Sequence, residues 1–399
     1  MRQTIDIALP RLHQAQRQIV SEARRFNALC CGRRFGKSTL GVQLLARTAL
    51  GGKPAACFFP TYRMLAEVWR DLVARLAPIT RGKREQEHRL DLLTGGVIEM
   101  WSLQEPNVAR GRKYARVVID EAAMIAPLEE AWQAVIRPTL TDYAGDAWFL
   151  STPKGQNYFA ALYDKGQQAE GDWQSWRMPS HQNPHLPPSE LVALQDELPA
   201  LVYAQEVLAE IVADGLAVFN PGDLDRADRL PVDTPPMPSM HTLMSVDIGR
   251  RRDATVINVF DTRREPFQRV YHERLDRVPY PVIQSTIERV ARQYGGRLFI
   301  ESNGVGDPVI ENLMVKAEPF ITTARSKAQA IQALQLLLEK GRIAARWTPQ
   351  ERRELIGYAW DDRALQQDCV MSLAIGAYHL VQPPPQPVRR PASFTIETG

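Results

Sequence analysis

The segment that most constrains the fold is an apolar run, Phe26–Cys31, followed by a short loop and then Gly36, Lys37 and Ser38. Glycines let backbone N–H groups turn inward around phosphate oxygens, and a helix that begins at such a loop adds partial positive charge. In this pattern Lys37 bridges the β and γ phosphates, and the Ser38 hydroxyl ligates Mg²⁺. The segment therefore predicts a strand, a phosphate loop and a helix that together bind ATP with Mg²⁺.

The loop departs from the usual G-x-x-x-x-G-K-S pattern at its start. Cys31 stands where the first glycine belongs, and Gly32, Arg33 and Arg34 follow it. A shifted glycine matches by chance more easily than the full pattern does. The nucleotide site, with Gly32, Arg33, Arg34 and Thr39 among its predicted binding residues, therefore depends on support from other parts of the chain.

That support comes from a second apolar segment, Val117–Ile119, which is expected to be a buried strand and is followed by Asp120 and Glu121. Hydrolysis of a nucleoside triphosphate needs one carboxylate near the Mg²⁺ and another group that activates the attacking water. We assign the first role to Asp120 and the second to Glu121. The alternative is that the two acids cap a helix or lie in a surface turn.

Two further side chains are candidates at the same site. Gln16 lies upstream of the loop, and its amide can pair with both the donor and the acceptor edge of adenine. An exposed helical glutamine is the alternative. Arg110 is a candidate for neutralising charge on the transferring phosphoryl group, and Arg112 is its rival. Both arginines can also be ordinary surface residues.

The first 212 residues alternate short apolar segments with amphipathic ones, which is typical of an α/β domain built on a mostly parallel sheet. The chain is long enough, at 399 residues, for two or three domains. Other elements expected in this domain are strands at Ala56–Phe59 and Trp148–Leu150, a helix over Leu65–Leu76, and a hairpin over Leu92–Ser102.

Residues 213–240 are expected to be a linker, because the segment Leu230–Met240 contains four prolines. Residues 241–382 are expected to form a second domain, and the proline-rich residues 383–399 a flexible tail. The order of elements in this domain fits a ribonuclease H-like α/β fold. The expected strands are Leu243–Val246, Thr255–Phe260, Phe267–Arg274 and Leu298–Glu301, and the expected helices are Val282–Tyr294, Lys327–Glu339 and Val370–Leu380.

Acidic residues stand at the ends of these predicted elements. Asp247 and Glu301 follow strands, Asp253 precedes one, and Asp368 begins a helix. Carboxylates from separate elements can converge on two Mg²⁺ or Mn²⁺ ions that clamp the attacking and leaving oxygens of a phosphodiester. Each acid considered alone is more often a cap or a solvated turn residue. Taken together, they predict a metal-dependent nuclease site.

Charge and composition exclude several classes of protein. The net charge of +3 is too small to indicate a polyanionic partner, so any contact with DNA depends on local clusters such as Arg250–Arg252. The four cysteines have neither zinc-ligand nor disulfide-framework spacing. Neither a signal peptide nor a membrane-spanning segment is expected. These features favour a cytosolic protein without a membrane partner.

Both halves of the sequence resemble the large terminase subunits of tailed bacteriophages. The first half does so through the motifs LHQAQ, GRRFGKST, ARGRKYARVVIDEA and STPKG, and the second through SVDIGRRRDATV, FIESNGVGDPV and DCVMSLAIGAY. The resemblance covers nearly the whole chain, and it includes the shifted glycine. Two positions depart from the usual family pattern, because Glu301 stands where many members have Asp and Gln367 stands where an acid is common.

The resemblance implies roles for individual residues. Ser151 and Thr152 would couple hydrolysis to movement. Asp247, Glu301 and Asp368 would be metal ligands of the nuclease, with Asp253 a fourth or supporting acid. Gln16 would belong to the adenine motif, Lys37 and Ser38 to the phosphate loop, and Asp120 and Glu121 to the acids that hold Mg²⁺ and activate water.

The function that this resemblance implies is an ATP-driven motor that packages viral double-stranded DNA and cuts concatemers with a metal-dependent endonuclease. Implied partners are a small terminase subunit, the portal protein of the capsid and further copies of the chain in a ring, in the cytoplasm of an infected bacterium. A P-loop helicase or translocase whose second domain binds DNA or a partner without cleaving is the first alternative. A nucleotide switch that binds ATP without turnover is the second.

Overall fold

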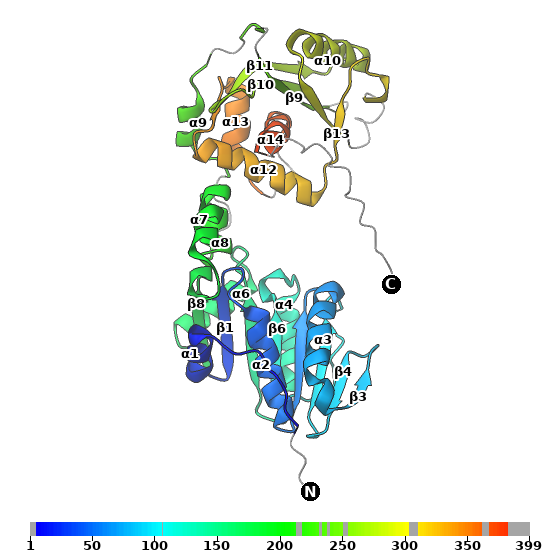
Figure 1. The fold of residues 1–399 in the computed structure, drawn as a ribbon, viewed down its shortest axis with the longest axis vertical. Coiled ribbons are helices and arrows are strands. Elements are labelled where there is room, and N and C mark those ends of the chain that lie inside the picture. The colour runs from blue at the N-terminus through cyan, green and yellow to red at the C-terminus, as the bar shows by residue number, and fades with distance from the viewer. Residues whose placement is uncertain are drawn as a thin grey trace, which may run out of the picture. The chain divides into compact units, whose positions relative to one another are not determined.

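The computed structural model describes residues 5–105, 107–212, 218–230, 234–237, 240–249, 254–302, 310–360 and 367–381. The chain divides into two compact units, residues 1–214 and 215–399 (Figure 1). Each unit has its own sheet with helices packed on it. We describe the two units separately.

The first unit contains an eight-stranded sheet with the strand order β3-β4-β5-β2-β6-β7-β1-β8. From β5 to β8 in this order all neighbours pair in parallel, while β3, β4 and β5 pair antiparallel. The strands are β1 (Phe26–Cys31), β2 (Pro54–Phe59), β3 (Thr80–Arg84), β4 (Arg89–Leu92), β5 (Val97–Ser102), β6 (Arg116–Asp120), β7 (Asp146–Ser151) and β8 (Trp173–Met178).

Helices cover both faces of this sheet, which explains why its central strands are continuous apolar runs rather than alternating ones. One apolar core lies between the sheet and α1, α2 and α3, and a second core contains residues of α4 and α6. The helices are α1 (Gln14–Glu22), α2 (Lys37–Leu50), α3 (Tyr62–Leu76), α4 (Leu128–Glu130), α5 (Arg137–Thr139), α6 (Tyr158–Gln167), α7 (Pro188–Glu197) and α8 (Ala200–Glu206).

The second unit contains a six-stranded sheet with the order β13-β12-β9-β10-β11-β14. The first three strands in sequence pair antiparallel, and β12 then returns to pair in parallel with β9. Helix α10 packs on one face of this sheet, and α12, α13 and α14 belong to the core on the other. The strands are β9 (Thr242–Asp247), β10 (Ala254–Asp261), β11 (Phe267–Asp276), β12 (Arg297–Glu301), β13 (Glu318–Phe320) and β14 (Ile343–Ala344), and the helices are α9 (Pro221–Ala227), α10 (Tyr280–Tyr294), α12 (Ala324–Glu339), α13 (Pro349–Gly357) and α14 (Asp368–Val381).

The predicted fold class is confirmed, and every strand and helix predicted by range is present within the described residues. The predicted linker differs from the structure in one respect. Residues 218–227 pack into the core of the second unit, where Phe219 and Leu224 are buried. The indole N–H of Trp347 donates to the carbonyl of Leu224 at 2.8 Å. The domain limits remain a prediction, and residues 382–399 lie outside the described part.

In the described part of the chain, none of the helices combines the length and the apolar character that crossing a membrane requires.

Candidate active sites

The phosphate loop lies between β1 and α2, as predicted. Cys31 is the last residue of β1 and is fully buried, so the position that glycine usually occupies is here part of the strand. Gly32 packs against backbone from two other segments. A Cβ atom on Gly32 would lie 2.3 Å from the Ser180 hydroxyl oxygen and 2.4 Å from the Val207 carbonyl oxygen. The shifted glycine is therefore required by close packing at residue 32.

Gly36 immediately precedes α2 as its N-cap residue and adopts a left-handed conformation, with φ of 101°. Glycine reaches this region without strain, whereas other residues do so at a cost. Arg33 and Arg34, which precede Gly36 in the loop, are bound by residues from other segments. The Asn183 amide donates to the carbonyl of Arg34 at 2.7 Å, and Arg33 forms an ion pair with Glu206. Both arginine side chains are exposed, and Thr39 is half-buried at the start of α2.

Lys37 is buried at the centre of the site. Its ammonium donates to the Thr152 hydroxyl at 2.8 Å and lies 3.5 Å from a carboxylate oxygen of Glu121. Burial alone would lower the pKa of Lys37, but the neighbouring Cys31, Glu121 and Asp120 raise it above its ordinary value. The ammonium is therefore charged, as its predicted contact with phosphates requires.

Asp120 ends β6 and is 5% exposed. One of its oxygens accepts from the Ser38 hydroxyl at 3.1 Å, and the other accepts from the backbone N–H of Glu121 at 3.0 Å. Burial raises the pKa of Asp120 to about 6, and the charge of Glu121 adds to this effect, while Lys37 opposes it. A buried carboxylate paired with a hydroxyl is a donor set that suits Mg²⁺. The residues present therefore fit the metal of an ATP complex.

Glu121 has a strained backbone, with φ of 50° in the left-handed region. Residues other than glycine seldom adopt this conformation, and it often occurs at functional positions. The turn that follows is held to β7, because the N–H of Ala123 donates to the Ser151 hydroxyl at 3.0 Å. Glu121 is thus fixed between the end of β6 and Lys37, which suits a residue that orients a water molecule.

Ser151 and Thr152, the predicted coupling pair, link this site to β7. The Ser151 hydroxyl donates to the carbonyl of Thr152 at 2.8 Å, and the Thr152 hydroxyl accepts from Lys37. The pair therefore contacts both the lysine of the phosphate loop and the turn that carries Glu121. The coupling role of the pair stays a prediction.

Gln16 is 1% exposed, so the alternative of an exposed helical glutamine is wrong. Its amide oxygen accepts from the N–H of His13 at 3.0 Å, and its amide nitrogen donates to the carbonyl of Gly36 at 2.9 Å. These bonds connect α1 to the phosphate loop. The structure therefore gives Gln16 a supporting contact with the loop, and pairing of Gln16 with adenine stays a prediction.

The structure distinguishes the two candidate arginines. Arg112 is engaged, with its guanidinium 3.4 Å from a carboxylate oxygen of Glu99 and 5.5 Å from the ring centre of Trp101. Arg110 is exposed, and within the described residues its side chain makes no ion pair. Arg110 is thus the less engaged of the two arginines, and its action on a phosphoryl group stays a prediction.

In the second unit, Asp247 ends β9 and Glu301 ends β12. These strands are parallel neighbours in which Val246 lies opposite Ile300, so the two acids follow at the same edge of the sheet. Adjacent strands are about 4.8 Å apart. The predicted placement of these two carboxylates side by side is therefore supported by the strand register.

Asp368 begins α14 at the same end of the sheet. Its carboxylate accepts from the N–H of Ala254 at 3.0 Å, and Ala254 is the first residue of β10, which runs antiparallel to β9. Arg274 lies 3.6 Å from the same carboxylate oxygen and 3.4 Å from Glu354. Asp368 is therefore near Asp247 in the fold, but it is held by an arginine and a backbone N–H.

The described residues do not form a complete metal site in this unit. Among them, no three His, Cys, Asp or Glu side chains gather closely enough to hold a metal ion. Asp253 and Arg250–Arg252 lie outside the described residues. The two-metal site remains a prediction.

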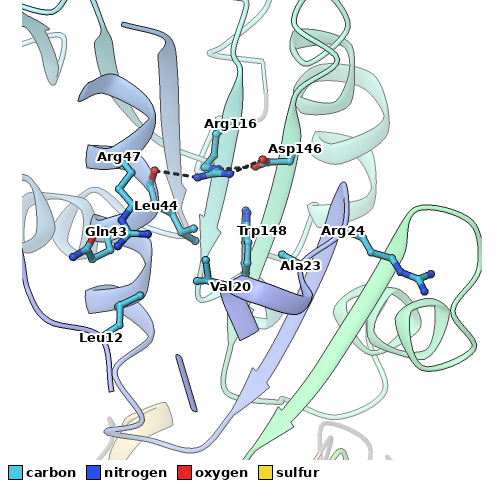
Figure 2. A pocket seen from close by; sticks show the side chains of 10 residues that line it. All are labelled: Leu12, Val20, Ala23, Arg24, Gln43, Leu44, Arg47, Arg116, Asp146 and Trp148. Carbon is cyan, nitrogen blue, oxygen red and sulfur yellow. Dashed lines mark hydrogen bonds and ion pairs between the residues drawn. The ribbon is translucent and has the colours of Figure 1, made fainter. Parts of the chain in front are cut away.

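A cavity of about 290 Å³ lies between α1, α2 and the sheet of the first unit (Figure 2). Its wall includes an ion pair of 2.7 Å between Arg116 and Asp146, which are the first residues of β6 and β7. Asp120 and Ser151, which belong to the nucleotide site, end the same two strands. Arg116 and Asp146 therefore line the cavity at the opposite end of the sheet from the nucleotide site.

Sequence reasoning missed three residues that hold these sites together. Glu99 fastens Arg112, Arg274 pairs with Asp368, and Asn183 holds the phosphate loop. Only Glu99 has a signal in the sequence, because it is a lone acid inside an apolar strand. Arg274 and Asn183 are polar residues in polar surroundings, and their contacts come from segments distant in sequence.

No family model matches this chain, but its sequence is similar to large terminase subunits of phages. The large terminase subunit of Escherichia phage T5 is 25% identical over 344 residues, which cover 80% of this chain and 75% of the relative. The large terminase subunit of Thermus phage G20c is 26% identical over 384 residues, which cover 83% and 78% of the two chains.

A solved structure shows that the likeness extends to the fold. The large terminase of the thermophilic bacteriophage D6E aligns with 92% of this chain and 98% of its own, with a TM-score of 0.60 at 14% identity. The same protein has also been solved in complex with ATP-gamma-S. The resemblance that the motifs predicted is confirmed.

Proposed function

We infer that this chain, a relative of the large terminase subunits of phages, is an ATPase joined to a nuclease that packages viral double-stranded DNA and cuts it from concatemers. The observation that carries the first activity is the contact of Lys37 with Thr152 and Glu121 beside the Ser38 and Asp120 pair. These are the groups that phosphoryl transfer requires, because it depends on positioning and charge stabilisation more than on covalent chemistry.

In the ATPase unit, the N–H groups of the loop and the ammonium of Lys37 hold the phosphates. Ser38 and Asp120 would hold Mg²⁺, which neutralises charge that develops on the transferred group. Glu121 would orient the attacking water, and Arg110 would neutralise charge on the transferring phosphoryl group. Gln16 keeps the loop in place from the side of α1. The other predicted nucleotide-binding residues are Gly32, Arg33, Arg34, Gly36 and Thr39.

In the nuclease unit, Asp247, Glu301 and Asp368 would hold two Mg²⁺ or Mn²⁺ ions, with Asp253 as a supporting acid. Bound divalent ions supply a water with a lowered pKa and stabilise the leaving oxygen of a phosphodiester. Asp247 and Glu301 already lie on neighbouring strand ends. Movement of Asp368 away from Arg274 would complete the set.

Coupling and partners follow from this assignment. Ser151 and Thr152 connect hydrolysis to movement of the unit on DNA. Arg250–Arg252, which follow Asp247 closely in the sequence, are proposed to contact the DNA backbone, which makes binding sensitive to salt and independent of sequence. The proposed partners are a small terminase subunit, the portal protein of the capsid and further copies of this chain in a ring. The proposed location is the cytoplasm of the infected bacterium.

The test compares two variants of the full chain, each with a single substitution, one in the first unit and one in the second. Glu121→Gln should abolish DNA-stimulated phosphate release and leave plasmid cleavage in Mn²⁺ without ATP unchanged. Asp247→Asn should abolish cleavage and leave phosphate release unchanged. Asp225→Asn, in an exposed ion pair with Arg352, is the control for the second unit.

Three other results would each favour a different reading. ATP binding without phosphate release from the unsubstituted chain would identify a nucleotide switch. DNA-stimulated hydrolysis without cleavage would identify a translocase whose second domain only binds. Cleavage that survives Asp247→Asn would remove Asp247 from the metal site.

A further inference from the structure

Glu99 is an acid inside β5 that is only 3% exposed. Its neighbours Ile98 and Met100 face the core that contains α2 and α3, so Glu99 faces the opposite side of the sheet. There it accepts from the Tyr114 hydroxyl at 2.5 Å and from Arg89 at 2.8 Å. Arg112 lies 3.4 Å away.

Two of these three partners belong to the loop that carries Arg110. Arg112 stacks over Trp101 as well as pairing with Glu99, and the Trp101 N–H donates to the Tyr114 hydroxyl at 2.9 Å. The far end of the loop is therefore clamped to β5 by one connected network. Such networks of buried polar groups are stronger than isolated contacts and fix one geometry.

The near end of the loop is also fixed, because Ala109 is fully buried. Between these anchors, Gly111 has φ of 80° and makes a turn that other residues resist. The N–H of Arg112 donates to the carbonyl of Ala109 at 3.2 Å across that turn. Arg110 therefore extends from a short turn whose two flanks are fastened to the protein.

We propose that Glu99 is a positioning residue for Arg110, and that Arg112 and Tyr114 are the anchors through which Glu99 acts. This proposal rests on the role of Arg110 in ATP hydrolysis proposed above. The contacts of Glu99 are with Tyr114, Arg89 and Arg112, so it acts through these side chains. It fixes the turn so that the Arg110 guanidinium is presented in one position, which matters because charge stabilisation in phosphoryl transfer depends on placement.

The charge of Glu99 is needed as well as its shape. Burial and the charge of Glu99 raise the pKa of the Tyr114 hydroxyl, so this group remains a donor to the carboxylate. Arg89 retains a second carboxylate partner, Asp91, at 2.9 Å. Loss of charge at Glu99 would therefore loosen the Arg110 loop more than the β3–β4 hairpin.

The test measures DNA-stimulated ATP hydrolysis by the full chain. Arg110→Ala should lower kcat by about 10³-fold or more. Glu99→Gln should lower kcat by about 10- to 100-fold with KM for ATP unchanged, since a displacement of about 1 Å is enough for a loss of this size. Tyr114→Phe should lower kcat in the same direction by a smaller factor. Glu87→Gln, in an exposed ion pair with Arg84, is the matched control and should change nothing.

Two comparisons separate positioning from a merely structural role. The double variant Glu99→Gln with Arg110→Ala should be as active as Arg110→Ala alone, because Glu99 acts only through Arg110. A further loss in the double variant would overturn the proposal. Arg112→Lys should retain more activity than Arg112→Ala, because lysine keeps the charge that pairs with Glu99, although it loses the planar fork.

Failure of this inference can be told from failure of the proposed function. If Arg110→Ala hydrolyses ATP at the normal rate, the role of Arg110 is wrong and Glu99 has nothing to position. If Arg110→Ala is inactive while Glu99→Gln keeps the normal kcat, the role of Arg110 stands and the inference about Glu99 is overturned.

Discussion

The Ser38 hydroxyl lies 3.1 Å from the Asp120 carboxylate and thereby joins the first turn of α2 to the last residue of β6. The two elements are far apart in sequence, and the parallel sheet brings them together at the carboxyl ends of its strands. Lys37, one residue before Ser38, contacts the residue after Asp120. The phosphate loop and the two acids are thus directly connected, so ATP binding and ATP hydrolysis depend on the same contacts.

The raised pKa of Asp120 predicts how stability depends on pH. Its ordinary value is 3.8, and burial in the fold raises it to about 6. Below pH 3.8 the group is protonated in both the folded and unfolded states. As the pH rises towards 6, only the unfolded state releases the proton, so the free energy of unfolding falls, by up to about 3 kcal/mol.

The measurement is the free energy of unfolding of the nucleotide-free chain between pH 4 and 7, compared with Asp120→Asn. The asparagine variant should lose this part of the pH dependence, so the difference between the two proteins should grow as the pH rises to 6. Asp142→Asn, in an exposed pair with Lys113, is the control. Parallel curves for the native chain and Asp120→Asn would show that Asp120 titrates normally.

Gly32→Ala tests the reason for the shifted glycine. The new Cβ would lie 2.4 Å from the Val207 carbonyl oxygen, and this backbone cannot move aside cheaply. We expect a loss of about 1 to 3 kcal/mol in the free energy of unfolding, together with weaker ATP binding. The matched control is Gly357→Ala, because Gly357 ends α13 with nothing within 4 Å of its added Cβ. Unchanged stability of Gly32→Ala would show that the loop accommodates a side chain.

Gln16→Ala tests whether Gln16 supports the loop or reads the base. Because its amide nitrogen donates to the carbonyl of Gly36, we expect the affinities for ATP and GTP to fall by the same factor, about 5- to 10-fold for a lost hydrogen bond. Equilibrium binding of fluorescent ATP and GTP analogues measures this. Gln18→Ala, which removes an exposed contact with Glu22 on the same helix, is the control. A loss confined to ATP would assign Gln16 to adenine instead.

Much of the fold was predictable because its strands are apolar runs and its helices are amphipathic. β1 and α2 were predicted from the phosphate loop, and β9, β10 and β12 were predicted as strands of the second domain in their order along the chain. α9 was not found, because its packing depends on Leu224 meeting Trp347, a contact across more than a hundred residues. The proline-rich segment Leu230–Met240, which follows α9, led us to predict a linker over residues 213–240.

The candidate site was predictable where residue type and position along a strand coincide. Lys37, Ser38 and Asp120 follow directly from strand ends and a glycine loop. The burial of Gln16 was not predictable, because it depends on α1 packing beside the phosphate loop, where the Gln16 amide bonds to the carbonyl of Gly36. The pairing of Asp368 with Arg274 was also hidden, since the two residues lie 94 positions apart in the sequence and meet only in the folded unit.

The second unit contains a fully buried ion pair between Arg269 and Glu351, both 0% exposed, which gives a sharp test of its stability. Glu351→Ala leaves the guanidinium buried without its carboxylate. We expect the free energy of unfolding of this unit to fall by about 3 to 5 kcal/mol. Glu318→Ala, which breaks the exposed pair with Arg297, should cost about 0 to 1 kcal/mol. Unfolding in chemical denaturant is measured through two activities. Plasmid cleavage reports on the second unit, and ATP hydrolysis reports on the first. Loss of cleavage at lower denaturant in Glu351→Ala, with hydrolysis unaffected, is the expected result, and equal midpoints for the two variants would contradict it.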